Sequence, residues 1–261
     1  MEDRPDKYAI HAAAREGKGE SVVYVLRTHK GKIADGSIRN CPVDVVESLL
    51  HANPKLAQLK DDDGRLAIHW AASYNQPEVV SLLISQKGFD PDAEDDSGWT
   101  PLMIAASVKD ADKVVDILLA RGADVNQTNN NGQTALHFLA SKSNLDLARK
   151  LLEQHTPAAS TRVRDKRGQY PIHRAAAVGS VPMLNLLIKH NSPLNATDSA
   201  GQTPLHHAIA EGHGDAAIAL LKAGAEADKK DVDGFLPLDL APGKDVRKYI
   251  ERKAEEEGIE L

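Results

Sequence analysis

The chain has 261 residues, of which 41% are hydrophobic and only 4% aromatic, and Ala and Leu carry most of the apolar content. Its formal net charge of −6 disfavours the broad cationic surface that nucleic-acid-binding proteins need, although it leaves room for a local basic patch. A single cysteine, Cys41, excludes an intramolecular disulfide and indicates a reducing compartment. Residues 1–5 carry mixed charge, so we expect no secretory signal, and no stretch approaches the roughly 18 apolar residues of a membrane span.

A short motif recurs along nearly the whole chain, and in its clearest copy it reads Gly-Gln-Thr-Pro-Leu-His. Its copies occupy residues 6–11, 64–69, 98–103, 132–137, 168–173, 201–206 and 234–239, the last of them degenerate. The glycines that open the six later copies are 34, 34, 36, 33 and 33 residues apart. This pattern resembles the ankyrin repeat, which carries T-P-L-H-x-A at a period near 33. The resemblance implies an all-α solenoid of seven helix-turn-helix units with β-hairpin-like tips.

Each repeat contains recognisable local signals. An acidic residue or Asn before Gly, as at Gly64 and Gly132, suits a hairpin tip that needs a positive φ. Thr or Tyr followed by Pro then predicts a cap and the first residue of a short, Ala-rich helix. A second helix follows, with apolar residues spaced to form one face that a neighbouring repeat must cover. The predicted apolar face comprises Val79, Val80, Leu82, Leu83, Val114, Val115, Leu118, Leu119, Leu147, Leu151, Leu152, Met183, Leu184, Leu186, Leu187, Ile218, Leu220 and Leu221.

The first repeat is longer than the others, because His11 and His69 are 58 residues apart. We place an insertion near residues 17–41 and the second helix of this repeat at residues 43–52. An alternative places that helix at residues 22–26 with the insertion after it. The predicted organisation is a single domain over residues 1–261, with the first repeat at about 6–62 and later repeats starting near residues 63, 97, 131, 167, 200 and 233.

The sequence contains no motif typical of an enzyme, so we expect no catalytic residues, no cofactor and no metal. Histidines recur with the repeat at His11, His69, His137, His173 and His206. We interpret each as a hydrogen-bonding link to an adjacent tip, since stacked repeats hold the rings too far apart to share one ion. His206, His207 and His213 form the one local cluster, and a zinc site there is the competing interpretation.

Candidate binding residues come from three columns of the repeat that we expect on one concave face. In the second to fourth repeats these columns hold Trp70, Tyr74, Trp99, Ile104, Val108 and Phe138. The group is bordered by Arg65, Lys142 and Arg174, with Asp62, Asp63, Asp95 and Asp96 on neighbouring tips. Aromatic residues flanked by Arg are typical of protein–protein hot spots. Trp70, Ile104 and Phe138 have the alternative of packing between helices, and Arg65 and Lys142 that of solvated charge.

Beyond the repeat, the chain resembles the gankyrin family of proteasome-assembly chaperones. The resemblance is carried by Ile68-His-Trp-Ala-Ala-Ser73, Asp95-Asp-Ser-Gly-Trp-Thr-Pro-Leu102, Ile104-Ala-Ala-Ser107, Ala140-Ser-Lys142 and His173-Arg-Ala-Ala-Ala177. It implies a concave face that holds the C-terminal domain of a proteasomal AAA-ATPase subunit, delaying its docking on the core particle. The family's basic contacts map onto Arg65 and Lys142, and its acidic contacts onto Asp63 and Asp96.

The resulting hypothesis is a non-catalytic chaperone of 19S regulatory-particle assembly in the cytoplasm and nucleus, a monomer when free, with no nucleic-acid or membrane partner. An alternative is a generic ankyrin-repeat adaptor or inhibitor of an unrelated protein, such as a kinase or transcription factor. A metal protein built on the histidine cluster is the remaining alternative.

Overall fold

A computed structural model describes residues 5–16 and 42–261. The chain divides into two compact units, Met1–Asn130 and Asn131–Leu261. The predicted insertion at about residues 17–41, the alternative helix at residues 22–26 and Cys41 lie outside the described residues.

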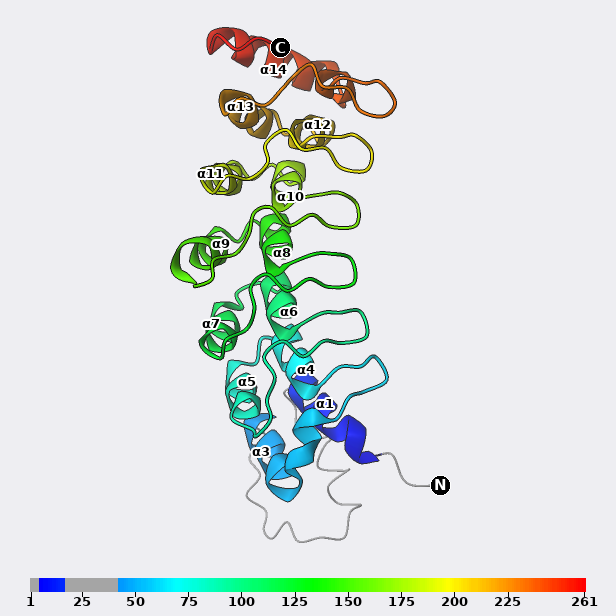
Figure 1. Cartoon of the computed structure of the whole chain (residues 1–261), viewed down its shortest axis with the longest axis vertical. Helices are drawn as coiled ribbons and strands as arrows, with labels where there is room; N and C mark the ends of the chain where they lie inside the picture. The colour runs from blue at the N-terminus through cyan, green and yellow to red at the C-terminus, as the bar shows by residue number, and fades with distance from the viewer. Residues whose placement is uncertain (1–4, 17–41) are drawn as a thin grey trace. The chain divides into compact units, whose positions relative to one another are not determined.

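The first unit contains three helix pairs, one for each of the first three repeats. They are α1 (Pro5–Glu16) with α3 (Pro42–Ala52), α4 (Ala67–Ser73) with α5 (Pro77–Ile84), and α6 (Pro101–Ser107) with α7 (Asp112–Ala120). A short 3₁₀ helix, η1 (Pro54–Gln58), follows α3. The second helix predicted at residues 43–52 is therefore confirmed as α3, which packs against α1. Figure 1 shows α4 and α6 side by side, with α5 and α7 on one flank and the tips on the other.

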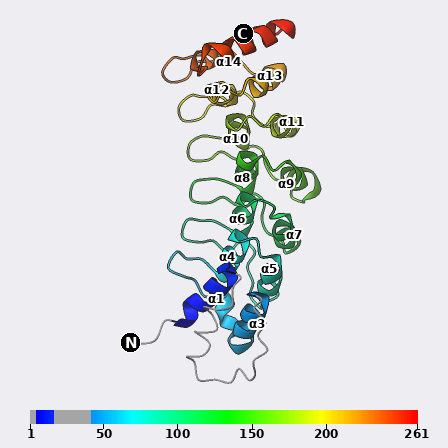
Figure 2. The same ribbon diagram turned by 180° about the vertical axis from the view of Figure 1, so that it is seen from behind.

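The second unit continues the same plan through four repeats. Its helices are α8 (Ala135–Lys142) with α9 (Leu145–Arg149), α10 (Pro171–Ala177) with α11 (Val181–Lys189), α12 (Pro204–Ala210) with α13 (Gly214–Lys222), and the 3₁₀ helix η3 (Pro237–Leu240) with α14 (Lys244–Glu256). Helix α9 runs on into a π-helical turn, η2 (Lys150–Gln154). Figure 2 shows α8, α10 and α12 between their tips and the second helices. Within residues 5–16 and 42–261, no helix has the length and apolar character needed to cross a membrane.

The first helices begin where the capping residues predict. Thr100 is extended, its side chain accepts a hydrogen bond from the amide of Met103, and Pro101 follows as the first helical residue. Thr203 caps α12 in the same way through the amide of His206, at 3.4 Å. A proline fits this position because it has no amide hydrogen and the first turn of a helix leaves its amides without intrahelical partners.

The core of each unit consists of small first-helix residues packed against the apolar face of the second helices. Ala67, Ala71 and Ala72 of α4 are fully buried, so the neighbouring backbones approach closely. The predicted second-helix residues are buried, except that Leu82 and Leu119 are half-buried at the margin of the face. Such a face is covered by adjacent repeats, and this is why stability in these proteins depends on stacking.

The tips are hairpin-like turns without regular strands in the described part of the chain. Five of them close through a backbone bond such as that from Asp95 N to Trp99 O, at 3.0 Å. Gly98 has a φ of +75°, and a Cβ there would lie 2.8 Å from the amide nitrogen of Asn130. Successive tips are joined by single backbone bonds, including Asp96 N to Asp63 O at 3.0 Å. The positive φ predicted for tip glycines is confirmed, at +73° for Gly64 and +76° for Gly132.

Candidate partner-binding surface

The recurring histidines link each first helix to the tip segment that follows it. In His137 and His206, Nδ1 accepts the backbone amide three residues earlier, which leaves the proton on Nε2. The Nε2 atoms then face backbone carbonyls: Arg65 O for His11 (2.9 Å), Ala93 O for His69 (3.0 Å), Gln169 O for His137 (3.3 Å), Ala196 O for His173 (3.1 Å) and Phe235 O for His206 (3.4 Å). The predicted structural role of these rings is confirmed.

Burial lowers the pKa of two of these rings, those of His137 and His173. Loss of hydration lowers the pKa of His137 and of His173 to about 4, because the charged ring is disfavoured away from water. A hydrogen bond to a backbone carbonyl opposes this effect in both cases without cancelling it. The rings are therefore neutral near neutral pH, as their acceptor role at Nδ1 requires.

The cluster of His206, His207 and His213 does not converge on a shared point. His207 Nε2 lies 2.9 Å from Asp198 Oδ2, and His213 Nε2 lies 3.2 Å from the carbonyl oxygen of Ala177. Across the residues that the structure describes, no group of three or more His, Cys, Asp or Glu side chains is placed to hold a metal ion. The three histidines instead make separate contacts: His207 with the tip of its own repeat, and His206 and His213 with neighbouring repeats.

Aspartates at the tips organise the neighbouring side chains. Asp61 Oδ1 accepts the amides of Asp63 (3.0 Å) and Arg65 (2.8 Å), while its Oδ2 accepts the indole Nε1 of Trp70 at 2.8 Å. Asp95 uses Oδ1 in the same way, at 2.9 Å from the amide of Trp99. One carboxylate oxygen thus shapes the tip and the other is left to orient a side chain.

Arg65 and Trp70 form the centre of the surface in the first unit. The Arg65 Nε–H donates to Asp95 Oδ2 at 3.0 Å, and its guanidinium carbon lies 5.0 Å from the Trp70 ring centre. The guanidinium of Arg15 lies 5.8 Å from the same ring, so two cations flank one indole. A cation at such distances is attracted by the ring quadrupole, typically by about 0.5–1 kcal/mol at exposed sites.

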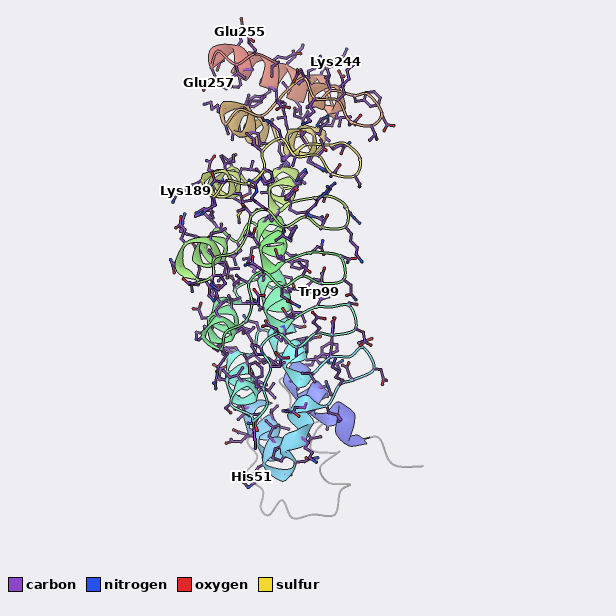
Figure 3. The ribbon with its side chains drawn as sticks, viewed as in Figure 1. His51, Trp99, Lys189, Lys244, Glu255 and Glu257 are labelled. Atoms are coloured by element: carbon purple, nitrogen blue, oxygen red, sulfur yellow. The ribbon has the colours of Figure 1, made fainter. Side chains whose placement is uncertain are left out.

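Beside this centre, the other predicted residues differ in exposure. Tyr74 is 51% exposed, and its ring centre lies 6.5 Å from that of Trp70. Trp99, labelled in Figure 3, and Val108 are half-buried. Ile104 is only 6% exposed and packs in the core. We therefore correct its assignment: it supports α6 from within and offers almost no surface to a partner.

Acidic groups lie next to the aromatic residues. Asp63 and Asp96 are exposed on adjacent tips that share a backbone hydrogen bond. A hollow of about 350 Å³ lies at the first of these tips, between α1 and Trp70. It is lined by His11, Ala12, Arg15, Asp61, Asp62, Asp63 and Trp70. The surface therefore offers carboxylates and fixed cations within one unit.

The second unit holds the three remaining predicted residues. Phe138 is half-buried on α8. Lys142, at the end of α8, is exposed and makes no hydrogen bond or ion pair within the described residues. Arg174 is held by Asp165, with Nη2 2.8 Å from Oδ2. Arg174 and Arg65 are thus each fixed by a tip aspartate, whereas Lys142 is solvated.

The role of the tip aspartates is what the sequence interpretation missed. Asp61, Asp95, Asp165, Asp198 and Asp231 all stand three residues before a tip glycine, and this spacing is visible in the sequence. Their second oxygens also orient Gln169, through Asp198 at 3.0 Å, and Gln202, through Asp231 at 3.4 Å. The spacing alone could have indicated a recurring anchor.

Comparison with known proteins finds ankyrin repeats along most of the chain and a similar protein that is named as a proteasome subunit. The family described as "Ankyrin repeats (3 copies)" matches residues 11–129, 105–161 and 136–231. The chain is 43% identical over 145 residues to the "Probable 26S proteasome regulatory subunit p28" of Saccharomyces cerevisiae, a match that covers 54% of this chain and 62% of that protein.

Two further proteins with ankyrin repeats are similar to this chain. An "Ankyrin repeat-containing protein C6C3.08" of Schizosaccharomyces pombe is 37% identical over 53 residues, covering 20% of this chain and 23% of its own length. The crystal structure of the ankyrin repeat domain of Bcl-3, a member of the IkappaB protein family, superimposes with a TM-score of 0.67 at 23% identity. That superposition covers 95% of this chain and 98% of the Bcl-3 chain, and it concerns the fold alone.

Proposed function

Because the chain belongs to the ankyrin-repeat family, we propose that it is a non-catalytic protein-binding chaperone of proteasome assembly. Its partner is the C-terminal domain of a proteasomal AAA-ATPase subunit, held during assembly of the 19S regulatory particle. The observation that carries the proposal is the 43% identity over 145 residues to the yeast protein named as a 26S proteasome regulatory subunit. The proposal includes a monomeric free state and a location in the cytoplasm and nucleus.

The arrangement around Arg65 supports this role physically. Asp95 and the Trp70 ring hold the Arg65 guanidinium in place, so this side chain is already ordered before a partner binds. Preorganisation of this kind reduces the entropy lost on binding. Within the described residues the Arg65 terminal nitrogens make no hydrogen bond, so they remain donors for an incoming carboxylate.

The acidic residues support a partner that also carries positive charge. Asp63 and Asp96 are exposed on tips whose backbones are bonded to each other. Complementary charge across an interface fixes orientation and speeds association more than it adds affinity. A domain with both acidic and basic patches therefore fits this surface better than a uniformly charged partner.

Binding to a panel of purified ATPase C-terminal domains tests the proposal directly. We expect one domain to bind, and the double variant Arg65→Glu with Lys142→Glu to bind it about a hundredfold more weakly or worse. The control is Lys113→Glu with Lys248→Glu, which changes the net charge equally at exposed positions on second helices.

A third variant separates binding from folding. Lys142→Glu alone disturbs no internal bond, so it should weaken binding while leaving helicity and unfolding unchanged. If no ATPase domain binds, the chaperone proposal is wrong, and the alternative of an adaptor or inhibitor for an unrelated kinase or transcription factor takes its place. If binding occurs but survives the double variant unchanged, the carried-over interface is wrong.

A further inference from the structure

The tip of the fifth repeat differs in charge from the other tips. The seven residues ending at its glycine, Arg162-Val-Arg-Asp-Lys-Arg-Gly168, contain four cations and one anion. The matching segments at residues 58–64, 92–98, 195–201 and 228–234 are net acidic, and residues 126–132 are neutral. A local concentration of positive charge in a chain of net charge −6 is a feature that the overall charge balance conceals.

The backbone of this tip is held on both sides. Lys166 N donates to Asn131 O at 2.8 Å, and Arg167 O accepts from Ser199 N at 2.8 Å. These two bonds fix the tip to both neighbouring tips. The cationic side chains therefore project from a rigid base, and this reduces the cost of ordering them on binding.

The anion within this tip does not neutralise it. Asp165 is 5% exposed, and its Oδ1 accepts the amides of Arg167 and Gln169, at 2.9 and 2.8 Å. Its Oδ2 accepts from Arg174 at 2.8 Å, so this buried carboxylate is already paired. Arg164, Lys166 and Arg167 are exposed and make no ion pair within the described residues, so their charge faces solvent.

A hollow lies beside these cations. It measures about 190 Å³ and is lined by Asn131, Gln133, Asp165, Lys166, Arg167 and Arg174. Since a water molecule takes about 30 Å³ in the liquid, this is room for several waters or one acidic side chain. The buried Nε of Arg174 has no hydrogen-bond partner, and an unsatisfied buried donor of this kind is rare in native proteins.

We propose that Arg164, Lys166, Arg167 and Arg174, together called the basic tip, bind an acidic segment of a protein partner. One carboxylate enters the hollow beside Lys166 and Arg167, where Arg174, whose charge Asp165 already balances, forms part of the wall, and further acidic residues lie along the exposed cations. Charge-assisted hydrogen bonds to carboxylate are stronger than neutral ones, which favours this ligand. The assignment concerns the chemistry of the fifth repeat and does not depend on the partner being a proteasomal ATPase.

The size of the basic tip favours a protein segment over nucleic acid. Nucleic-acid affinity is built from many phosphate contacts, commonly about 6–10. Here three exposed cations and the paired Arg174 lie on one tip and its helix, and the flanking segments at residues 126–132 and 195–201 contain no cation. A long polyanion would find no further cation on either neighbouring tip, whereas a short acidic segment needs none.

The test is fluorescence anisotropy with a labelled oligoglutamate peptide, and with a labelled oligothymidylate of equal charge as the nucleic-acid arm. The variant is Lys166→Glu with Arg167→Glu in the full chain. The control is Lys244→Glu with Lys248→Glu on α14, which makes the same change in net charge at exposed positions. Circular dichroism verifies that both variants fold.

We expect the wild type and the control to bind oligoglutamate, and the Lys166/Arg167 variant to bind it at least about tenfold more weakly. Binding of the wild type should also weaken as salt is added, because exposed charges are screened. Equal oligoglutamate binding by the Lys166/Arg167 variant and the wild type would overturn the proposal. So would the absence of oligoglutamate binding, or tighter binding of oligothymidylate, which would assign the basic tip to nucleic acid instead.

Discussion

Acidification should destabilise the second unit through His137 and His173 well before its carboxylates titrate. Both rings are buried and donate Nε2–H to a carbonyl, and burial lowers the pKa of each from 6.5 to about 4. The unfolded chain therefore binds more protons than the folded chain between these two values. Their stabilising contribution is complete above the unfolded pKa of 6.5 and is lost as the pH falls towards 4.

The size of the effect follows from the two pKa values. At about 1.36 kcal/mol for each factor of ten, the full difference corresponds to about 3 kcal/mol per ring. Between about pH 7 and about pH 5 the loss is about 2 kcal/mol per ring, or about 4 kcal/mol for the pair. Burial lowers the pKa of His69 and His206 as well, so the whole chain should lose at least this much.

Carboxylates contribute in a separate range of pH. Burial opposes ionisation of Asp165 and Asp198, but hydrogen bonds from Gln169 and other donors lower the pKa of both below 3.8. Their stabilising effect is present above 3.8 and is lost only as the pH falls through the folded-state values. A loss of stability between pH 7 and 5 can thus be assigned to histidine.

Urea unfolding followed by circular dichroism over this range of pH measures the effect. The test variant is His137→Gln with His173→Gln, and the control is His51→Gln on the exposed side of α3. The double variant should be less stable at neutral pH but should lose about 4 kcal/mol less than the wild type on acidification. If the two curves of free energy against pH run parallel, the argument from buried neutral rings is wrong.

Two further changes test the tips. Gly168→Val should destabilise the protein by about 2–5 kcal/mol, because a β-branched residue is strained at a φ of +79° and its Cβ would lie 2.9 Å from Ser199 N. Gly224→Val is the matched control, with a φ of +94° but open space around the Cβ, so urea unfolding should show a clearly smaller loss. Asp165→Ala removes the oxygen that accepts two backbone amides and leaves Arg174 unpaired, so about 3 kcal/mol of unfolding free energy should be lost. A loss below about 1 kcal/mol would contradict the anchoring role of this carboxylate.

The local structure of each repeat could be predicted because its causes lie close together in the sequence. A positive φ at Gly98, a cap at Thr100 and a proline at position 101 depend on a few neighbouring residues. The period of the apolar residues in turn indicates which face of each second helix is covered. The same signals recur at the same positions of successive repeats, so a weak signal in one repeat is supported by its neighbours.

The candidate binding surface was less accessible to prediction, because tip aspartates orient its long side chains. Arg65 is fixed by Asp95, 30 residues away, and Arg174 by Asp165. Trp70 and Phe138 are half-buried, yet Ile104 in the same column is only 6% exposed, so a position in the repeat does not by itself fix the exposure of its residue.

The sequence by itself therefore determined the repeat, its helices, its turns and the linking histidines, all of which follow from spacing within about one period. Only the tertiary structure decided which carboxylate holds which cation, which column residue is buried, and that Lys166 and Arg167 line a hollow without an ion pair to any described residue. Arg65 and Asp95 are 30 positions apart, and their pairing exists only once the repeats are stacked. Arg174 and Asp165 are nine positions apart, and they pair because the tip folds back against its own helix.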